Sequence, residues 1–314
     1  MQQRFNVSAS ARTLGAAAVT TLLLAALSAC GGSGSDGATA TVSSMSIAST
    51  KYGAPAQVTV VGTNLGNLNL QATGCKNVTR LTASPTASTD TTAYFSCTPS
   101  GAYTSQILAV SNGGTIAQQT LTVLAPVVTM AVSGGGVNGN IVINLKGNVA
   151  PITVDNFLAY VNSGFYTGTI MHRVVDQTNT LEGPEYDVIQ GGSYGAATSG
   201  TLPTAKATTF APIALETSGG TNVQWTMAMA RTSDPNSATS GFFFNVKNDT
   251  AAFDTTSGPG YAVFADVSGS SAILTQIAAI GQGGSSVCTP LAGFSDGSCV
   301  PIPNVTITSA TQTQ

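Results

Sequence analysis

The sequence contains the segment FYTGTIMHRV at positions 165–174, followed by VIQGG at positions 188–192. The first segment places Arg173 among apolar, strand-forming side chains, in a chain of which only 7% of the residues are charged. A guanidinium in apolar surroundings is costly unless it neutralises or hydrogen-bonds another group. We therefore interpret Arg173 as a residue that contacts a substrate.

The composition predicts a folded, exported protein that is rich in β-structure. The chain has 314 residues, 42% of them hydrophobic, which is enough for two ordinary domains. Gly, Ser, Thr and Ala take the place of Lys and Glu, a bias that favours strands and turns over exposed helices. The formal net charge is −3 and only ten residues are Lys or Arg, so the sequence offers no basic stripe for phosphates. We exclude nucleic acid as a partner.

Residues 1–29 are typical of a signal peptide, because Arg4 and Arg12 precede an apolar run that is too short to span a bilayer comfortably. The run ends in Leu-Ser-Ala-Cys, which resembles the cleavage box of bacterial lipoproteins. This resemblance implies cleavage before Cys30, lipidation of its thiol and a membrane anchor in the cell envelope. Gly31 in place of aspartate is the pattern associated with the outer membrane, facing the periplasm or the cell surface. The alternative is an ordinary secretory signal, after which residues 30–41 still form a flexible tether.

Four cysteines remain after Cys30, an even number that suits an oxidising compartment. Three pairings are possible, and we expect Cys75 with Cys97 and Cys288 with Cys299, because each pair lies within one candidate module. Four unpaired thiols are the alternative. A zinc site is disfavoured because the chain has one histidine and no Cys-x-x-Cys spacing, and we expect neither a metal nor a cofactor.

Residues 42–125 predict a small β-sandwich. Short alternating runs at 57–61, 92–97 and 119–123 are separated by turn residues. The length of the segment and its cysteine pair resemble an immunoglobulin-like module, although no tryptophan lies between the cysteines. The segment gathers no titratable side chains that could perform chemistry, so we interpret it as a spacer.

The succession of short alternating runs and turns ends at Pro126, which marks a domain boundary. An alternating strand at 139–145 precedes a helix at 154–161, for which Thr153 is the expected N-cap and Gly164 the stop. A second helix is predicted at 271–280. Strands and long loops are predicted between the two helices.

The order strand, strand, helix and then the segment at 165–174 is the order found in cyclophilins. Four further segments resemble segments of that family and follow in the same order, at positions 188–192, 226–232, 234–245 and 260–264. The resemblance covers residues 126–312. It implies a mainly β fold, with a closed antiparallel β-barrel and two capping helices, preceded here by the immunoglobulin-like sandwich. It also implies a monomeric peptidyl-prolyl cis-trans isomerase that acts on Xaa-Pro-containing polypeptides.

The resemblance assigns roles to individual residues. Arg173 matches the catalytic arginine, and Gln190 matches the glutamine that positions it. The barrier to rotation, about 18–20 kcal/mol, comes from amide resonance, and a cationic donor aimed at the prolyl nitrogen stabilises the twisted amide. Substrate-binding roles fall on the residues that match the prolyl pocket and its rim: Val188, Met229, Ala230, Arg231, Phe243, Phe253 and Tyr261.

Alternation along the strands limits which neighbours share this site. Phe243 is expected to face opposite to the phenylalanines on either side of it, and His172 is expected to face away from Arg173 as a packing residue.

Several positions depart from the family pattern. Gly241 stands where the family has a substrate-contacting glutamine, and the connection at 176–187 is longer than in relatives. Asp187 falls at an aromatic position, so one pocket wall is either polar or supplied by Tyr186.

The leading interpretation is an isomerase that assists the folding of exported proteins. The departures favour an alternative, a catalytically weak module that binds Pro-containing segments in a chaperone or adhesion role. A surface protein built on the sandwich alone is a third alternative.

Overall fold

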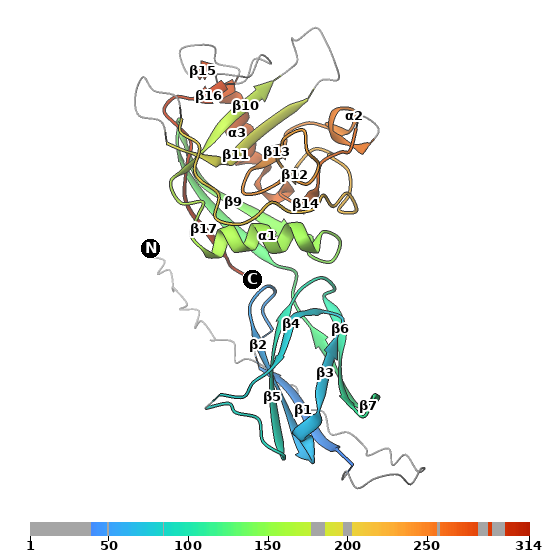
Figure 1. Ribbon diagram of the computed structural model, residues 1–314. Coiled ribbons are helices and arrows are strands. Elements are labelled where there is room, and N and C mark those ends of the chain that lie inside the picture. The colour runs from blue at the N-terminus through green and yellow to red at the C-terminus, as the bar shows by residue number, and fades with distance from the viewer. Residues whose placement is uncertain are drawn as a thin grey trace, which may run out of the picture.

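The structure is a computed structural model that describes residues 39–48, 50–83, 85–176, 186–196, 203–255, 258–281, 288–290 and 299–314 (Figure 1). The predicted signal peptide and Cys30 lie outside the described residues, as does most of the connection at 176–187. Within these ranges, every helix is too short or too polar to cross a bilayer.

The N-terminal module is a sandwich of two antiparallel sheets. The sheet orders are β1-β2-β5-β4 and β3-β6-β7, which is the strand order of an immunoglobulin constant-type domain. Alternate residues such as Val58, Val60 and Phe95 are buried between the sheets, as the alternating runs predict. The strands are β1 Thr41–Ala48, β2 Ala56–Thr63, β3 Asn69–Ala72, β4 Cys75–Arg80, β5 Thr92–Pro99, β6 Thr104–Ser111 and β7 Gly114–Thr122, with a short 3-10 turn at Leu65–Asn67.

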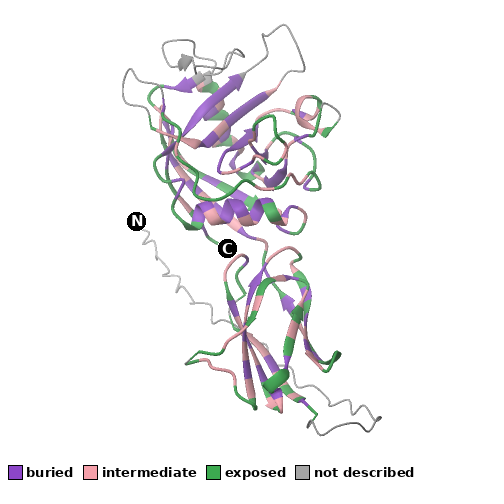
Figure 2. Ribbon diagram, viewed as in Figure 1, coloured by how far each residue is buried: buried purple, intermediate pink, exposed green. Residues whose placement is uncertain are grey.

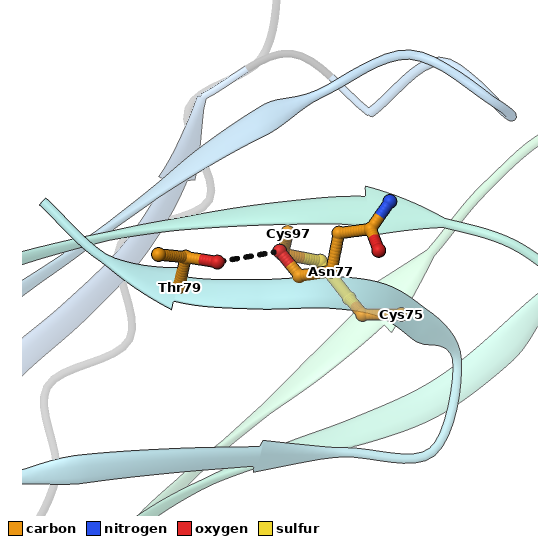
Figure 3. Close-up of a disulfide and its surroundings, with 4 residues drawn as sticks. All are labelled: Cys75, Asn77, Thr79 and Cys97. Atoms are coloured by element: carbon orange, nitrogen blue, oxygen red, sulfur yellow. Dashed lines mark hydrogen bonds between the residues drawn. A yellow bond between two sulfur atoms is a disulfide. The ribbon is translucent and has the colours of Figure 1, made fainter.

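A disulfide joins Cys75 to Cys97, which confirms one of the two predicted pairs (Figure 3). The bond connects the neighbouring strands β4 and β5 of one sheet, whereas the conserved bond of immunoglobulin domains crosses between sheets. Beside it, β4 bulges at Asn77, whose φ is 55°, and the Thr79 hydroxyl donates to the Asn77 carbonyl at 3.4 Å. The side chains of Cys288 and Cys299, the other predicted pair, lie outside what the structure describes.

Replacing both Cys75 and Cys97 by alanine is expected to lower the free energy of unfolding of the sandwich by about 3 kcal/mol. The bond closes a loop with a sequence separation of 22 residues, and closure reduces the conformational entropy of the unfolded chain. Chemical denaturation of the two proteins measures the difference. An unchanged unfolding midpoint and slope would show that the bond contributes nothing to stability.

The second module is a closed barrel, as the sequence predicts. Eight strands follow the order β11-β13-β12-β14-β9-β8-β17-β10, and β10 pairs back with β11 to close it. The strands are β8 Val127–Gly134, β9 Val137–Leu145, β10 Thr169–Asp176, β11 Asp187–Gly195, β12 Thr226–Met229, β13 Phe242–Asn245, β14 Val263–Asp266 and β17 Thr306–Gln312. A hairpin of β15 Cys288–Pro290 and β16 Cys299–Pro301 extends from β10.

Two helices cap the barrel, α1 at Pro151–Asn162 and α3 at Ser271–Gly281, and a short helix α2 spans Thr250–Phe253. A 3-10 turn at Ser268–Ser270 leads into α3. Helix α1 packs its buried face on the barrel core, where the Phe157 ring lies 5.2 Å from Phe264 and 6.1 Å from Phe242. Figure 2 shows α1, β10 and β11 coloured largely as buried. The interior of the barrel is therefore filled with side chains.

The start of α1 differs from the prediction that Thr153 is its N-cap. The helix begins at Pro151, and Thr153 lies in its first turn. The Glu216 carboxylate accepts from the backbone N–H of Ile152 at 3.2 Å and from that of Thr153 at 2.7 Å. A carboxylate at this end satisfies free N–H groups and complements the helix dipole. A distant residue thus replaces the local cap.

The sandwich packs directly against the α1 end of the barrel (Figure 1). Tyr52, in the turn between β1 and β2, is 1% exposed, and its hydroxyl donates to the Gly147 carbonyl at 3.2 Å. Asp155 of α1 forms an ion pair with Lys76 at 2.6 Å and accepts from the Ser100 hydroxyl at 2.7 Å. The sandwich is therefore fixed to the barrel by buried and charged contacts, which the sequence did not predict.

Candidate functional site

Five strands of the barrel carry one row of side chains on a single face. Arg173 of β10 lies opposite Gln190 of β11, which lies opposite Phe243 of β13. Phe243 pairs with Ala228 of β12, and Ala228 pairs with Val263 of β14. Directly paired residues share a face of a sheet, so these side chains form a continuous row. The apolar members join a small cluster of their own, separate from the barrel core, which places the row on the outside of the barrel.

Arg173 lies at one end of this row and donates hydrogen bonds to the side chains of Gln190 and Tyr186. It is 9% exposed. Its Nη1 donates to Gln190 Oε1 at 3.1 Å, and its Nη2 donates to the Tyr186 hydroxyl at 2.8 Å. The guanidinium also lies over the Tyr186 ring, 5.5 Å from its centroid. The sequence thus paired Arg173 and Gln190 correctly, and the structure adds Tyr186.

Four aromatic rings form the body of the cluster. Phe253 lies at the centre, with ring centroids 4.8 Å from Tyr186, 5.2 Å from Phe243 and 5.2 Å from Tyr261. Phe243 and Tyr261 are 5.4 Å apart. Phe243 and Val188 are buried, whereas Tyr186, Phe253 and Tyr261 are partly exposed. The result is an apolar surface with a buried floor and an aromatic rim beside Arg173.

The alternation expected around Phe243 is present. Phe242 and Phe244 lie in the barrel core, and Phe243 lies in the outer cluster. The same alternation corrects the prediction for Met229, whose side chain is 1% exposed and lies in the core. Because Met229 is next to Ala228 on β12, it faces the opposite side of the sheet from the cluster.

Ala230 and Arg231 complete the predicted set at the far end of the cluster. Ala230 packs against the cluster and donates its backbone N–H to the Gly241 carbonyl at 2.9 Å. The Arg231 guanidinium lies 4.3 Å from the centroid of the Tyr261 ring and is fixed by hydrogen bonds to the Gly260 carbonyl. The aromatic rim therefore has an arginine at each side.

The two departures from the family pattern have structural explanations. At Gly241, a Cβ would lie 2.5 Å from the Ser193 hydroxyl, so Ser193 of β11 takes the space of the missing side chain. Asp187 does not enter the cluster, because its carboxylate forms an ion pair with Lys247 at 2.7 Å. Of the two alternatives left open by the sequence, Tyr186 supplies the wall.

His172 is a packing residue, as predicted. It is 1% exposed, and its ring lies 4.5 Å from that of Tyr194. Burial, together with the positive charge of Arg173, lowers the pKa of His172 to about 4. The imidazole is therefore neutral at physiological pH and adds no charge behind the arginine.

Asp249 is a buried carboxylate behind the aromatic rim. It is 1% exposed, and its Oδ1 accepts from the Asp187 N–H at 3.1 Å. Burial raises its pKa to about 7, and the hydrogen bond from Asp187 and the charge of Lys247 only partly oppose the shift. Nothing in the sequence indicates a buried carboxylate at this position, which directly precedes α2.

Replacing Asp249 by asparagine is expected to stabilise the protein at pH 8 by about 1 kcal/mol or more and to leave its stability at pH 4 nearly unchanged. A carboxyl whose pKa is higher in the folded than in the unfolded protein favours folding below its unfolded pKa, and that advantage is lost as pH rises through about 7. Asparagine retains the Oδ1 acceptor and cannot ionise. Urea unfolding at a series of pH values measures the difference, and parallel pH profiles for the two proteins would refute it.

The arrangement supports electrostatic chemistry on an apolar ligand. It combines the Arg173 guanidinium and the Gln190 amide with an aromatic surface, and Arg231 lies at the far side of that surface. Among the described residues, no group of three His, Cys, Asp or Glu side chains is arranged to hold a metal ion. Such a site can grip a small ring and stabilise a developing lone pair beside it.

Comparison with known proteins gives matches to one family. The family model for cyclophilin type peptidyl-prolyl cis-trans isomerase/CLD matches residues 127–312, from the first residue of β8 to the last of β17. A peptidyl-prolyl cis-trans isomerase of Streptomyces antibioticus is 40% identical over 176 residues, which cover 55% of this chain and 92% of that protein. One from Acinetobacter baylyi is 45% identical over 130 residues, covering 41% of this chain and 61% of that protein. A solved cyclophilin type isomerase of Cryptosporidium parvum, in the presence of the dipeptide Ala-Pro, has a TM-score of 0.41 and 18% identity, covering 60% and 99% of the two chains.

Proposed function

We propose that this chain, which belongs to the cyclophilin-type peptidyl-prolyl cis-trans isomerase family and is a peptidyl-prolyl cis-trans isomerase, uses the outer row from Arg173 to Val263 as its active site. We propose further that it assists the folding of exported proteins. The observation that carries the proposal is the contact of a nearly buried arginine with an apolar, aromatic surface on the same face of the barrel.

The proposed mechanism uses the arginine as a fixed electrostatic donor. The prolyl ring lies on Phe243 and Val188, with the aromatic rim around it. Gln190 positions the guanidinium and the substrate backbone. As the Xaa-Pro bond twists, amide resonance is lost and the prolyl nitrogen becomes pyramidal, with a lone pair that Arg173 can stabilise. The planar ground state offers this donor little, so the interaction favours the transition state. An arginine stays protonated throughout, so no proton transfer is needed.

A refolding assay tests the role in protein folding. A denatured exported protein whose slow refolding phase is limited by a proline is expected to refold faster with catalytic amounts of this chain. The Arg173→Ala variant is the control and is expected to leave the slow phase unchanged. Equal rates with and without the wild-type chain would refute the folding role.

We propose attachment to the cell envelope through Cys30, on the basis of the lipoprotein-like box at residues 27–30. Expression of the full chain in a Gram-negative host, followed by fractionation, is expected to place it in the outer membrane. The Cys30→Ala variant is expected to lose the membrane fraction, whereas Cys288→Ala retains it. Recovery of both variants in the membrane would refute the lipid anchor.

A second candidate function is a weakly catalytic module that binds Pro-containing segments. It is favoured by Gly241, because the space of the family's substrate-contacting glutamine is taken by the shorter Ser193 side chain. Titration of an Xaa-Pro peptide and its isomerisation rate separate the two functions. Binding with no acceleration above the uncatalysed rate would support the module and refute the enzyme.

A further inference from the structure

We propose that Tyr186 is a positioning residue for Arg173, which acts through its hydroxyl and not only through its ring. The inference rests on the proposed prolyl site. Its basis is the pair of hydrogen bonds on the guanidinium: Gln190 Oε1 accepts from Nη1 at 3.1 Å, and the Tyr186 hydroxyl accepts from Nη2 at 2.8 Å.

The two contacts fix the plane of the guanidinium. Its donors form a rigid, planar fork, so acceptors on two different nitrogens restrict both the position and the rotation of the group. Both acceptors are neutral oxygens, so these two bonds contribute orientation to the guanidinium. Stabilisation of a developing lone pair depends on such preorganised charge.

Tyr186 is itself held in place from both sides. Its ring packs on Phe253, with centroids 4.8 Å apart. The next residue, Asp187, is fixed through its backbone and its side chain: its N–H donates to Asp249, its carbonyl accepts from the Val246 N–H, and its carboxylate pairs with Lys247. A side chain supported in this way can hold another at low entropic cost.

The hydroxyl gives Tyr186 a role that an aromatic ring alone could not fill. A phenylalanine would fill the same space against Phe253 but would offer no acceptor to Arg173. Truncation of the hydroxyl alone therefore tests the proposal, because the packing of the cluster is retained.

The experiment compares Tyr186→Phe with Tyr194→Phe, a matched change on β11, the strand that Tyr186 directly precedes; the Tyr194 ring lies against His172. For Tyr186→Phe, kcat for an Xaa-Pro peptide is expected to fall about five- to tenfold with KM within about twofold, because a hydrogen bond to a charged group is lost. Tyr194→Phe is expected to keep the wild-type kcat. The order parameter of the Arg173 Nε–H in NMR relaxation is expected to fall in the first variant only.

The two readouts separate this inference from the proposed function. An unchanged kcat or an unchanged Arg173 order parameter in Tyr186→Phe would overturn the positioning role. A wild-type protein without isomerase activity would instead refute the prolyl site, whereas the order parameter would still report whether Tyr186 holds the arginine.

Discussion

Replacing Arg173 by alanine is expected to lower kcat/KM for a short Xaa-Pro peptide by about 10²- to 10³-fold, the size of effect found when one transition-state donor is removed. The side chain is the only member of the outer row that carries a charge. Its loss removes stabilisation of the twisted amide and leaves the aromatic surface that grips the prolyl ring. We therefore expect most of the loss in kcat. Progress curves of cis–trans isomerisation measure it.

The matched variant is Arg173→Lys, which keeps the charge but cannot contact Gln190 and Tyr186 through two nitrogens at once. An intermediate loss is expected, because a lysine ammonium is a flexible point charge. The unfolding midpoints of the variants should be recorded in parallel, since Arg173 is 9% exposed and its removal disturbs the sheet surface. Folded Arg173→Ala protein with wild-type kcat/KM would contradict the assigned role.

Replacing Tyr52 by alanine is expected to destabilise the full chain by about 3–5 kcal/mol, as for other fully buried large side chains. The ring is 1% exposed between the two modules, and the hydroxyl accepts from the Gly101 N–H at 2.9 Å while donating to Gly147. Burial raises the pKa of Tyr52 to about 12, so the hydroxyl stays protonated. Calorimetry should show the unfolding of sandwich and barrel separating into two transitions.

Tyr94→Ala provides the control, because Tyr94 is a half-buried tyrosine of β5 in the same sandwich. This variant should cost less stability and should leave the coupling between the modules intact. If Tyr52→Ala unfolds in the same single transition as the wild-type chain, the contact does not couple the modules. The sandwich would then behave as the spacer that the sequence suggests.

The parts that sequence predicted best are those set by local periodicity. Period-two alternation assigned Phe243 to one face and its neighbours to the other, and the apolar spacing in 154–161 found the buried face of α1. The same rule would have excluded the Met229 side chain from the substrate-binding face, since the neighbouring residues Ala228 and Met229 point to opposite faces of β12. That error came from transferring a role by resemblance without testing it against the strand.

The parts that sequence missed depend on contacts between distant residues. Glu216 caps α1 from 63 positions away, and nothing near Thr153 indicates it. Whether Tyr186 or Asp187 forms the wall depends on the register at the start of β11, which is fixed by Val246 and Asp249. Tyr52 carries no local sign of an interface. In each case, the decisive partner lies far along the chain.

The central claim is that an Xaa-Pro peptide binds on the outer row beside Arg173, and NMR titration of the labelled protein tests it most directly. Backbone amide shifts should change at Gln190, Phe243, Ala230 and Tyr261 on addition of the peptide. A peptide with alanine in place of proline should change them far less. Shifts confined to the sandwich or to α3, with the outer row unaffected, would contradict the account.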